Sequence, residues 1–222
     1  MLLSAKSIIE VAARSSRLSR AQVVEVLREI NAFFPHIHFT TSWVTTTGDR
    51  DQTTSLRHLD KTNFFTREID EMLLGRECRI AIHSAKDLPD PLPKGLQIIA
   101  ITKGVDASDS LVFRSDKELK NTRHVGVSCA RREDMVKKII TDAFFSDIRG
   151  TIEQRLEQLE KGLFDAVVIA EAALIRLGLT YLKRLRLTGP VAALQGKLAV
   201  LAREGDREME KLFEPISIKS FS

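Results

Sequence analysis

The sequence predicts an α/β protein built from two units in which strands and helices alternate. Short apolar runs alternate along the chain with longer segments whose apolar residues recur at helical spacing. The pattern begins again after TKGVDASD (102–109), a polar stretch that contains a glycine. Because strands that alternate with helices favour parallel sheets, we expect two such sheets, one on each side of residue 104.

The predicted strands are short and rich in apolar, β-branched or aromatic residues. Four belong to the first unit, three belong to the second, and one lies alone near the C-terminus. They are residues 7–13, 38–46, 79–84, 96–101, 111–115, 124–129, 165–170 and 198–204.

The predicted helices carry apolar residues at intervals of three or four positions. Ser15 or Ser16 is suited to cap the first of them, residues 15–34. Its apolar stripe is expected to consist of Leu18, Ala21, Val24, Leu27 and Ile30. The other predicted helices are residues 63–75 (ended by Gly75), 130–140, 151–162, 171–179 and 206–214.

The composition fits a globular protein with a mild preference for anionic ligands. Of 222 residues, 43% are apolar and 29% are charged, and 34 basic against 30 acidic residues give a net charge of +4. No apolar run approaches the length of a membrane-spanning helix. The N-terminal segment MLLSAKSIIEVAARSS lacks the long apolar core and the cleavage site of a signal peptide. We therefore expect a cytoplasmic protein with no membrane partner.

Neither a metal site nor nucleic-acid binding is expected. The two cysteines, Cys78 and Cys129, form no pattern typical of zinc, and without a secretion signal no disulfide is expected. Aromatic residues make up only 6% of the chain and do not interleave with basic ones, as an RNA-binding sheet requires. We expect a monomer that binds a small molecule. An RNA-binding protein would instead show a steep salt dependence of its RNA affinity.

Basic side chains gather where predicted strands end and helices begin. Ligands of open α/β sheets bind at the carboxyl ends of strands, and helix N-termini attract anions. Arginine adds a two-pronged donor that matches carboxylate or phosphate. For each arginine alone, a solvated surface position is the favoured interpretation, but the set predicts a ligand with several negative groups. The basic residues at or near these junctions are Arg14, Lys86, Arg131, Arg132, Arg149 and Arg155.

Asp87 is an acidic exception among these cations. It follows Lys86 at the end of a predicted strand and precedes three prolines in the segment LPDPLP. The pattern leaves two interpretations open. Asp87 either forms a turn ahead of proline, or is a carboxylate that faces a cationic intermediate or transfers a proton.

The segment HSAKDLP (83–89) resembles the HSxKDxP motif of the porphobilinogen deaminase family, also called the hydroxymethylbilane synthase family. Further segments resemble motifs of the same family in the same order, and the resemblance covers essentially the whole chain. These segments are RSSRLSRAQ (14–22), TGD (47–49), FFTREID (64–70), GVSCARR (126–132), IRGTIEQRL (148–156), ALIRLGL (173–179) and AALQG (192–196).

The resemblance implies two domains like those of periplasmic binding proteins, with a cleft between them. The first would be discontinuous, comprising residues 1–103 and 198–222, and the second would comprise residues 104–197. The lone strand and helix at 198–214 would then complete the first sheet. A small third domain, expected after residue 222 in this family, is absent from the sequence.

The resemblance also implies a reaction. The family condenses four porphobilinogen molecules into the linear tetrapyrrole hydroxymethylbilane and releases ammonia at each step. Each pyrrole carries an acetate and a propionate, which gives a physical reason for many arginines. The product grows on a dipyrromethane cofactor, linked by a thioether to a cysteine of the third domain. The alternative is a catalytically impaired two-domain protein that binds tetrapyrroles or other small polyanions.

The resemblance assigns roles to individual residues by their motif positions. Asp87 matches the catalytic aspartate, which would stabilise the cationic azafulvene left when ammonia departs and handle pyrrole N–H protons. The side chains that would hold the cofactor and substrate carboxylates are Arg14, Ser16, Ser84, Lys86, Ser128, Arg131, Arg132, Arg149, Arg155, Arg176 and Gln195.

The sequence departs from the family pattern at several positions. Thr47 replaces the arginine of an RGD turn, Leu194 replaces a glycine, and Asp60–Asn63 replaces a GGKG loop. The GGC motif with the cofactor cysteine does not occur. The chain is then a fragment, an enzyme that holds its primer without that cysteine, or a relative without catalysis.

Cys129 stands where the family has a serine, at an expected helix N-terminus close to Arg131 and Arg132. These neighbours are expected to lower the pKa of its thiol. One hypothesis is that Cys129 is a surrogate attachment point for the cofactor. The other is that it is a small residue in the place of a serine.

Overall fold

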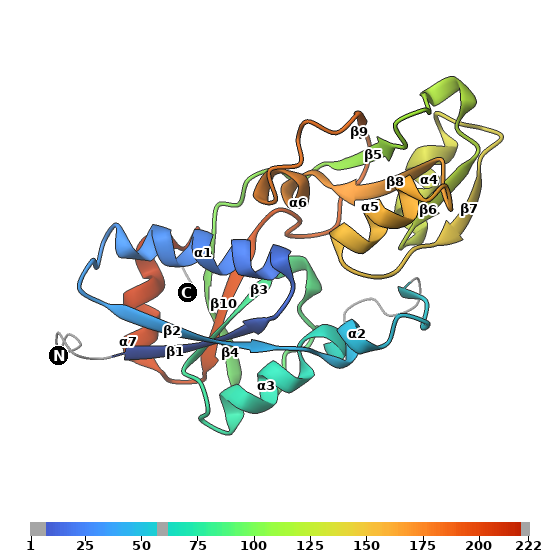
Figure 1. Ribbon diagram of the computed structural model, residues 1–222. Helices are drawn as coiled ribbons and strands as arrows, with labels where there is room; N and C mark the ends of the chain where they lie inside the picture. The colour runs from blue at the N-terminus through green and yellow to red at the C-terminus, as the bar shows by residue number, and fades with distance from the viewer. Residues whose placement is uncertain (1–7, 57–61, 219–222) are drawn as a thin grey trace. The chain divides into compact units, whose positions relative to one another are not determined.

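The computed structural model describes residues 8–56 and 62–218 as two compact units, each built around a five-stranded sheet (Figure 1). The described segment 51–56 belongs by its contacts to unit 2, although the described residues that flank it, Arg50 and Thr62, belong to unit 1. Unit 1 contains residues 8–50, 62–104 and 197–218, and unit 2 contains residues 51–56 and 105–196. The assignment of residues 1–103 with 198–222 and of residues 104–197 to two domains stays a prediction.

The sheet of unit 1 has the strand order β2-β1-β3-β10-β4. β1 pairs in parallel with β2 and β3, whereas β10 is antiparallel to both of its neighbours, β3 and β4. The expectation of a purely parallel sheet is therefore wrong at β10, because the chain enters this strand without a crossover helix. The strands are β1 (Ile8–Arg14), β2 (His38–Val44), β3 (Ile80–Ser84), β4 (Leu96–Ile101) and β10 (Leu198–Arg203).

The helices of unit 1 pack their apolar faces on this sheet, and one apolar core includes Val26, Ile30 and Phe213. Ser16 caps α1, because its Oγ accepts a hydrogen bond from the N–H of Ser19 at 3.2 Å. The α-helices are α1 (Arg17–Asn31), α2 (Thr47–Arg50), α3 (Arg67–Leu74) and α7 (Arg207–Phe213). The 3-10 helices are η2 (Asn63–Phe65), η3 (Ala85–Asp87) and η5 (Glu214–Ile216).

The buried stripe of α1 differs from the expected one. Val24 was expected in the core but is 55% exposed, whereas Val23 and Val26 are buried together with Ile30. Four of the five residues from 23 to 27 are apolar, so two overlapping stripes have helical spacing. Only packing against the sheet decides between the two stripes.

The sheet of unit 2 has the strand order β7-β6-β8-β5-β9, with β6 parallel to β7 and β8. β5 is antiparallel to β8 and β9, so the expectation of a parallel sheet is wrong at β5 as well. The sequence analysis missed both edge strands, which have only four residues each. The strands are β5 (Asp109–Phe113), β6 (His124–Val127), β7 (Phe144–Asp147), β8 (Ala166–Ala170) and β9 (Arg184–Leu187). The helices are η4 (Leu119–Asn121), α4 (Ala130–Lys137), α5 (Ile152–Glu160) and α6 (Glu171–Arg176).

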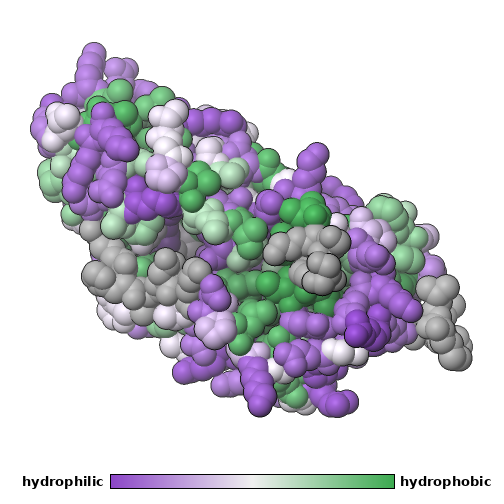
Figure 2. Space-filling model, turned by 180° about the vertical axis from the view of Figure 1, so that it is seen from behind, coloured by the Kyte–Doolittle hydropathy of each residue, from purple (hydrophilic) through white to green (hydrophobic). Residues whose placement is uncertain are grey.

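The surface mixes polar and apolar side chains. On the face seen in Figure 2, hydrophilic residues cover most of the area and apolar residues lie between them. Exposed apolar side chains include Phe33, Phe144 and Tyr181. In the described ranges, no helix has both the length and the apolar character needed to cross a membrane.

Two polar side chains in unit 1 are almost completely buried. Asp70 of α3 is 3% exposed; it accepts a hydrogen bond from Thr66 Oγ1, and its Oδ1 has no partner among the described residues. Burial raises the pKa of Asp70 to about 6, with Thr66 opposing the shift and Glu71 adding to it. His83 of β3 is 5% exposed, and burial followed by the charge of Arg14 lowers its pKa to about 4.

These two pKa shifts change stability in opposite directions as the pH varies. Asp70 binds its proton more tightly in the folded chain, so its contribution to stability falls as the pH rises from about 4 to 6. His83 binds its proton less tightly in the folded chain, so its contribution falls as the pH drops through the same interval. The two slopes therefore offset each other.

The AALQG segment turns tightly at Gly196, which has φ +85°. A Cβ at this position would lie 2.3 Å from the carbonyl oxygen of Asp106, so only glycine fits. The carbonyl of Gly196 accepts hydrogen bonds from the N–H of Val105 and from Nη2 of Arg176. Leu194, where the family has a glycine, has φ +58°, a left-handed conformation that glycine adopts more easily than leucine.

We predict that Asp70→Asn removes the opposing contribution of Asp70, so that the pH dependence of stability caused by His83 becomes measurable. Relative to the wild type, the free energy of unfolding of the variant should fall by up to about 1.4 kcal/mol per pH unit as the pH is lowered from 6 to 4. Urea unfolding at closely spaced pH values measures this difference. Thr66→Val, which keeps the carboxyl group and loses only the hydrogen bond that lowers its pKa, is the control; between pH 4 and 6 it should keep the opposing slope of Asp70, and this slope should extend to higher pH. Parallel curves for Asp70→Asn and the wild type would contradict the prediction.

We predict that Gly196→Ala lowers the free energy of unfolding by about 3 kcal/mol or more, because the new Cβ overlaps a backbone oxygen and the residue must keep a positive φ. Gly205→Ala is the matched control. Gly205 has φ +79° but no atom near its virtual Cβ, so only conformational strain of about 1 kcal/mol is expected. Equal losses in denaturant unfolding of the two variants would show that the contact with Asp106 has no effect.

Candidate functional site

The side chains expected to bind the ligand lie in both units. Most of these residues lie at ends of strands or starts of helices, whereas Arg155 lies within α5, Arg176 ends α6 and Gln195 lies in a turn. Unit 1 holds Arg14, Ser16, Ser84, Lys86 and Asp87. Unit 2 holds Ser128, Cys129, Arg131, Arg132, Arg149, Arg155, Arg176 and Gln195.

Arg14, the last residue of β1, is held by Asp49 of α2. Its Nε lies 3.2 Å from Asp49 Oδ1, and its Nη2 forms an ion pair with the same carboxylate. The ring of Phe65 lies against the guanidinium, with 4.5 Å from Cζ to the ring centroid. Gly48 leaves room for this ring, because a Cβ there would lie 2.4 Å from it. The edge of Arg14 that carries Nε and Nη2 is therefore used by the protein itself.

Asp49 remains ionised although it is largely buried. Burial by itself would raise the pKa of Asp49, but the hydrogen bonds and charge of Arg14 outweigh this effect. The N–H and the hydroxyl of Thr46 also donate to Asp49 Oδ2, at 3.0 and 2.9 Å. The pKa of Asp49 consequently lies below its ordinary value. The sequence analysis missed this residue, although it is the aspartate of the TGD segment.

Thr47, which stands in place of the motif arginine, joins α2 to α3. Its N–H and hydroxyl donate to Glu68 Oε1 at 2.7 and 2.6 Å. Arg67 in turn donates from Nη2 to Thr47 Oγ1 at 2.8 Å. Arg50 and Arg67 each lie 3.7 Å from Glu68 Oε1, so positive charge remains next to this carboxylate.

Lys86 and Asp87 lie in η3, directly after β3. The turn is anchored by the N–H of Ala85, which donates to the carbonyl of Lys197 at 3.0 Å. Both side chains are half-buried. Among the described residues, none donates a hydrogen bond to the carboxylate of Asp87, which therefore remains available to a ligand. Ser84 precedes the turn and is also half-buried, without capping η3.

In unit 2, Asp109 at the start of β5 joins the two adjacent arginines of α4. Its Oδ2 accepts a hydrogen bond from Arg131 Nη1 at 2.8 Å, and its Oδ1 accepts from Arg132 Nη2 at 2.7 Å and Nε at 3.1 Å. Burial alone would raise the pKa of Asp109, but both guanidinium groups outweigh it and hold the pKa below its ordinary value. The sequence analysis missed Asp109, because it considered no acid other than Asp87 near the basic residues.

Ser128 connects two of the expected ligand arginines. Its Oγ accepts from Arg132 Nη1 at 3.1 Å and lies 3.5 Å from Arg155 Nη1. Arg155 Nε donates to the carbonyl of Gly150 at 3.0 Å. Cys129, the N-cap residue of α4, is half-buried and makes no side-chain capping hydrogen bond. Ser128, Cys129, Arg132 and Arg155 thus lie at the carboxyl end of β6.

The remaining expected residues bind backbone carbonyl groups. Arg149 Nη2 donates to the carbonyl of Asp51 at 2.5 Å, and Arg176 Nη2 donates to that of Gly196 at 2.9 Å. Gln195 is 3% exposed, and its Nε2 donates to the carbonyl of Ala107 at 2.7 Å. The Gln195 amide therefore fixes the turn next to Gly196.

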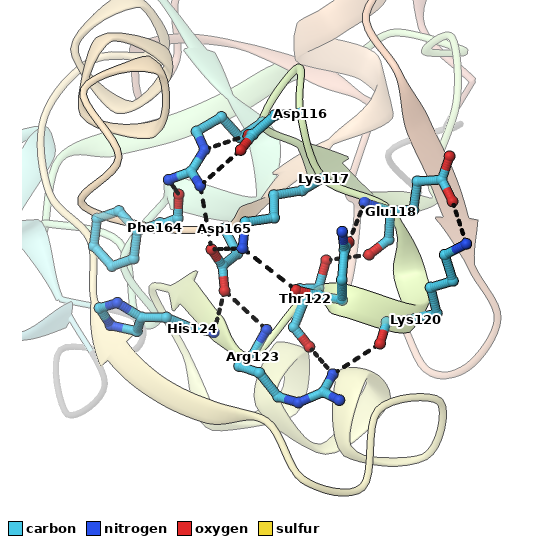
Figure 3. A network of polar contacts seen from close by, with 11 residues as sticks. Asp116, Lys117, Glu118, Lys120, Thr122, Arg123, His124, Phe164 and Asp165 are labelled. Carbon is cyan, nitrogen blue, oxygen red and sulfur yellow. Dashed lines mark hydrogen bonds and ion pairs between the residues drawn. The ribbon is translucent and has the colours of Figure 1, made fainter.

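A further polar network surrounds Asp165, which precedes β8 (Figure 3). Its Oδ2 accepts from the N–H groups of Arg123 and His124, and its Oδ1 lies 3.0 Å from Lys117 Nζ. A neighbouring pocket of about 480 Å³ includes Arg123 but none of the expected site residues. Among the described residues, no cluster of histidine, cysteine or acidic side chains is arranged to bind a metal ion.

Comparison with known proteins agrees with the motif resemblance. The family described as porphobilinogen deaminase, dipyrromethane cofactor-binding domain, matches residues 9–211. A probable porphobilinogen deaminase of Chlamydia pneumoniae is 37% identical over 96% of this chain and 91% of that protein. The porphobilinogen deaminase of Streptococcus sanguinis is 33% identical over 94% of this chain but 72% of that protein.

Among solved structures, the chain resembles a probable amino-acid ABC transporter extracellular-binding protein of Bacillus subtilis. The TM-score is 0.54 with 15% identity, over 95% of this chain and 90% of that chain. This likeness shows an α/β fold of the periplasmic-binding-protein type, as the sequence analysis expected. The matched family and the relatives, with the motif residues placed as described above, show that the chain belongs to the porphobilinogen deaminase family.

Proposed function

We propose that this chain condenses four porphobilinogen molecules head to tail into hydroxymethylbilane and releases ammonia at each condensation. Membership of the porphobilinogen deaminase family supports a transferase of tetrapyrrole biosynthesis. The observation that carries the proposal is the set of arginines fixed by carboxylates or backbone carbonyls at strand ends, represented by Arg14, Arg131 and Arg155. Every porphobilinogen unit brings two carboxylates, and fixed guanidinium groups bind carboxylates with little further loss of side-chain freedom.

The donors of unit 2 fit a dipyrromethane cofactor, because its side chains are carboxylates and these donors are guanidinium and hydroxyl groups. We propose that Arg131, Arg155 and Ser128 hold those carboxylates, and that Arg132 supports them through its hydrogen bonds to Asp109 and Ser128. When bound, dipyrromethane supplies the pyrrole to which the first substrate unit is joined. The matched family description names this cofactor.

Asp87 is proposed as the catalytic residue. When ammonia leaves a porphobilinogen unit with the electrons of its C–N bond, the remaining pyrrole becomes a cationic azafulvene. A carboxylate next to the pyrrole N–H stabilises this cation, and it also accepts the proton that the ring carbon loses after the new C–C bond has formed. The absence of a hydrogen-bond donor to Asp87 among the described residues supports this role, because a carboxylate already bound by the protein would be a poorer partner.

We predict that Asp87→Ala lowers the rate of hydroxymethylbilane formation by about a thousandfold or more, because one charged group that faces the transition state is lost. Porphobilinogen binding, measured by calorimetry, should remain or become tighter, because a negative charge is removed. Asp134→Ala, which removes an exposed acid from α4, is the control and should keep wild-type turnover. Turnover of the Asp87 variant at the control rate would contradict the catalytic role. Wild-type binding without turnover would favour the alternative of a tetrapyrrole or polyanion binder.

The attachment of the cofactor gives a second test, in which Cys129 is the hypothesised attachment point. Intact mass spectrometry of the purified chain, before and after incubation with porphobilinogen, should reveal an adduct that grows in single-pyrrole steps. Cys129→Ser should abolish it. Cys78→Ser is the control, because Cys78 is 2% exposed and burial raises the pKa of its thiol to about 11. An adduct retained by Cys129→Ser would exclude Cys129, and an unmodified wild-type chain would exclude covalent attachment altogether.

A further inference from the structure

Arg131 presents one complete donor edge that no described residue uses. Both hydrogens of Nη1 are taken, one by Asp109 Oδ2 and one by the carbonyl of Pro190, each at 2.8 Å. Nε and Nη2 have no acceptor among the described residues and are not among the buried atoms that lack a partner, so they reach solvent. This edge carries two parallel N–H groups, which is the arrangement that binds a carboxylate through both of its oxygens.

Arg132 has the opposite arrangement. Its Nε and Nη2 both donate to Asp109 Oδ1, and its Nη1 donates to Ser128. Its side chain is only 7% exposed, against 23% for Arg131. Arg132 therefore fixes Asp109, and Asp109 fixes the open edge of Arg131.

The net charge of Arg131, Arg132 and Asp109 also bears on which ligand they can bind. Asp109 is fully buried between two guanidinium groups, and together the three side chains carry one net positive charge. A buried arginine with no acidic partner is strongly destabilising, so Asp109 also contributes to the stability of the fold. A net charge of +1 matches the charge of one carboxylate. A growing polyanionic product must also be able to leave this group of side chains.

We propose that Asp109 is a positioning residue that holds the Nε–Nη2 edge of Arg131 toward a single carboxylate of the pyrrole chain. This inference rests on the proposed function, because it takes the pyrrole carboxylates as the ligand. It divides the work of the two arginines: Arg131 binds the ligand, and Arg132 supports Asp109. Asp109 itself acts through Arg131 and does not touch the substrate.

Unit 2 contains a second buried acid that serves as a matched control. Glu171 of α6 is fully buried, pairs with Arg184 at 2.8 Å and Arg186 at 3.4 Å, and accepts a hydrogen bond from Ser110 at 2.6 Å. The hydrogen bond from Arg184 lowers its pKa to about 2 although burial opposes this. None of its partners belongs to the expected ligand residues. Glu171→Gln therefore reproduces the loss of a buried charge without touching Arg131.

The test compares porphobilinogen affinity, measured by calorimetry, and the separate kinetic constants KM and kcat. Asp109→Asn should weaken binding and raise KM about tenfold to a hundredfold while changing kcat much less, because charge-assisted hydrogen bonds to a carboxylate are lost. Glu171→Gln should change KM less than about twofold. Unchanged affinity in Asp109→Asn, or an equal loss in Glu171→Gln, would overturn the proposal.

A double-mutant cycle decides whether Asp109 acts through Arg131. In the Arg131→Ala background, Asp109→Asn should weaken binding less than about twofold further, because the edge that it positions is already gone. If the losses of affinity caused by Asp109→Asn and Arg131→Ala multiply in the double variant, the proposal is overturned. Arg131→Lys covers the case in which Asp109→Asn does not fold, because it keeps the charge and loses the two-pronged edge. It should weaken binding about tenfold, and wild-type affinity in this variant would also overturn the proposal.

The same variants separate this inference from the proposed function. If the wild-type chain binds malonate but not porphobilinogen, the proposed function fails, and the cycle repeated with malonate still decides the role of Asp109. If porphobilinogen binds and the cycle shows no coupling, the function stands and the positioning role fails. If neither probe binds, both proposals fail.

Discussion

The pairing of arginines with buried or half-buried carboxylates at strand ends is the interaction on which both candidate binding regions depend. A guanidinium cannot be placed in a partly buried position without an acidic or carbonyl partner, because the loss of hydration is too costly. Asp49 meets this need for Arg14, and Asp109 meets it for Arg131 and Arg132. Each acid orders a long side chain during folding. The loss of rotamer freedom, which costs about 2 kcal/mol, therefore occurs during folding and does not weaken ligand binding.

The two acids leave different parts of their arginines available. Asp49 occupies the Nε–Nη2 edge of Arg14, so that arginine offers a ligand only its remaining N–H groups. Asp109 takes Nη1 of Arg131 instead and leaves the Nε–Nη2 edge open. An aspartate–arginine pair therefore leaves different N–H groups open to a ligand, depending on which nitrogen of the arginine the aspartate binds. The number of arginines alone does not describe what such a region binds.

Much of the fold follows from the sequence, because apolar runs and helical spacing report burial directly. The strand at 96–101 was predicted with the bounds that the structure has. The direction of β10 was not, because strand direction depends on the connection between units and not on local pattern. The edge strand β9 reads RLRL, and its charged residues hid it from a search for apolar runs. Packing, and not spacing, decided that Val23 and not Val24 faces the core.

The candidate residues could be located from the sequence, but their partners could not. Motif resemblance put Arg131 and Arg132 on one short segment, yet Asp109 lies 22 and 23 positions away and joins them only through the fold. The structure also assigns local tasks that the motifs do not specify. Ser16 caps α1, and the buried amide of Gln195 fixes a turn. The place of Ser16 before a predicted helix indicated its capping role, but no signal in a single sequence distinguishes the task of Gln195 from contact with a ligand.

The departures at Thr47 and Leu194 show that a motif position and its physical task can separate. Thr47 lacks the charge of the motif arginine, and Arg67, which donates to its hydroxyl and lies beside Glu68, places positive charge next to this position. Leu194 stands where the family has a glycine, and its backbone has a positive φ, which costs conformational strain in a residue that carries a Cβ. A motif score counts each substitution as a loss. The structure adds which charge lies beside the substituted position and which backbone conformation the new residue adopts.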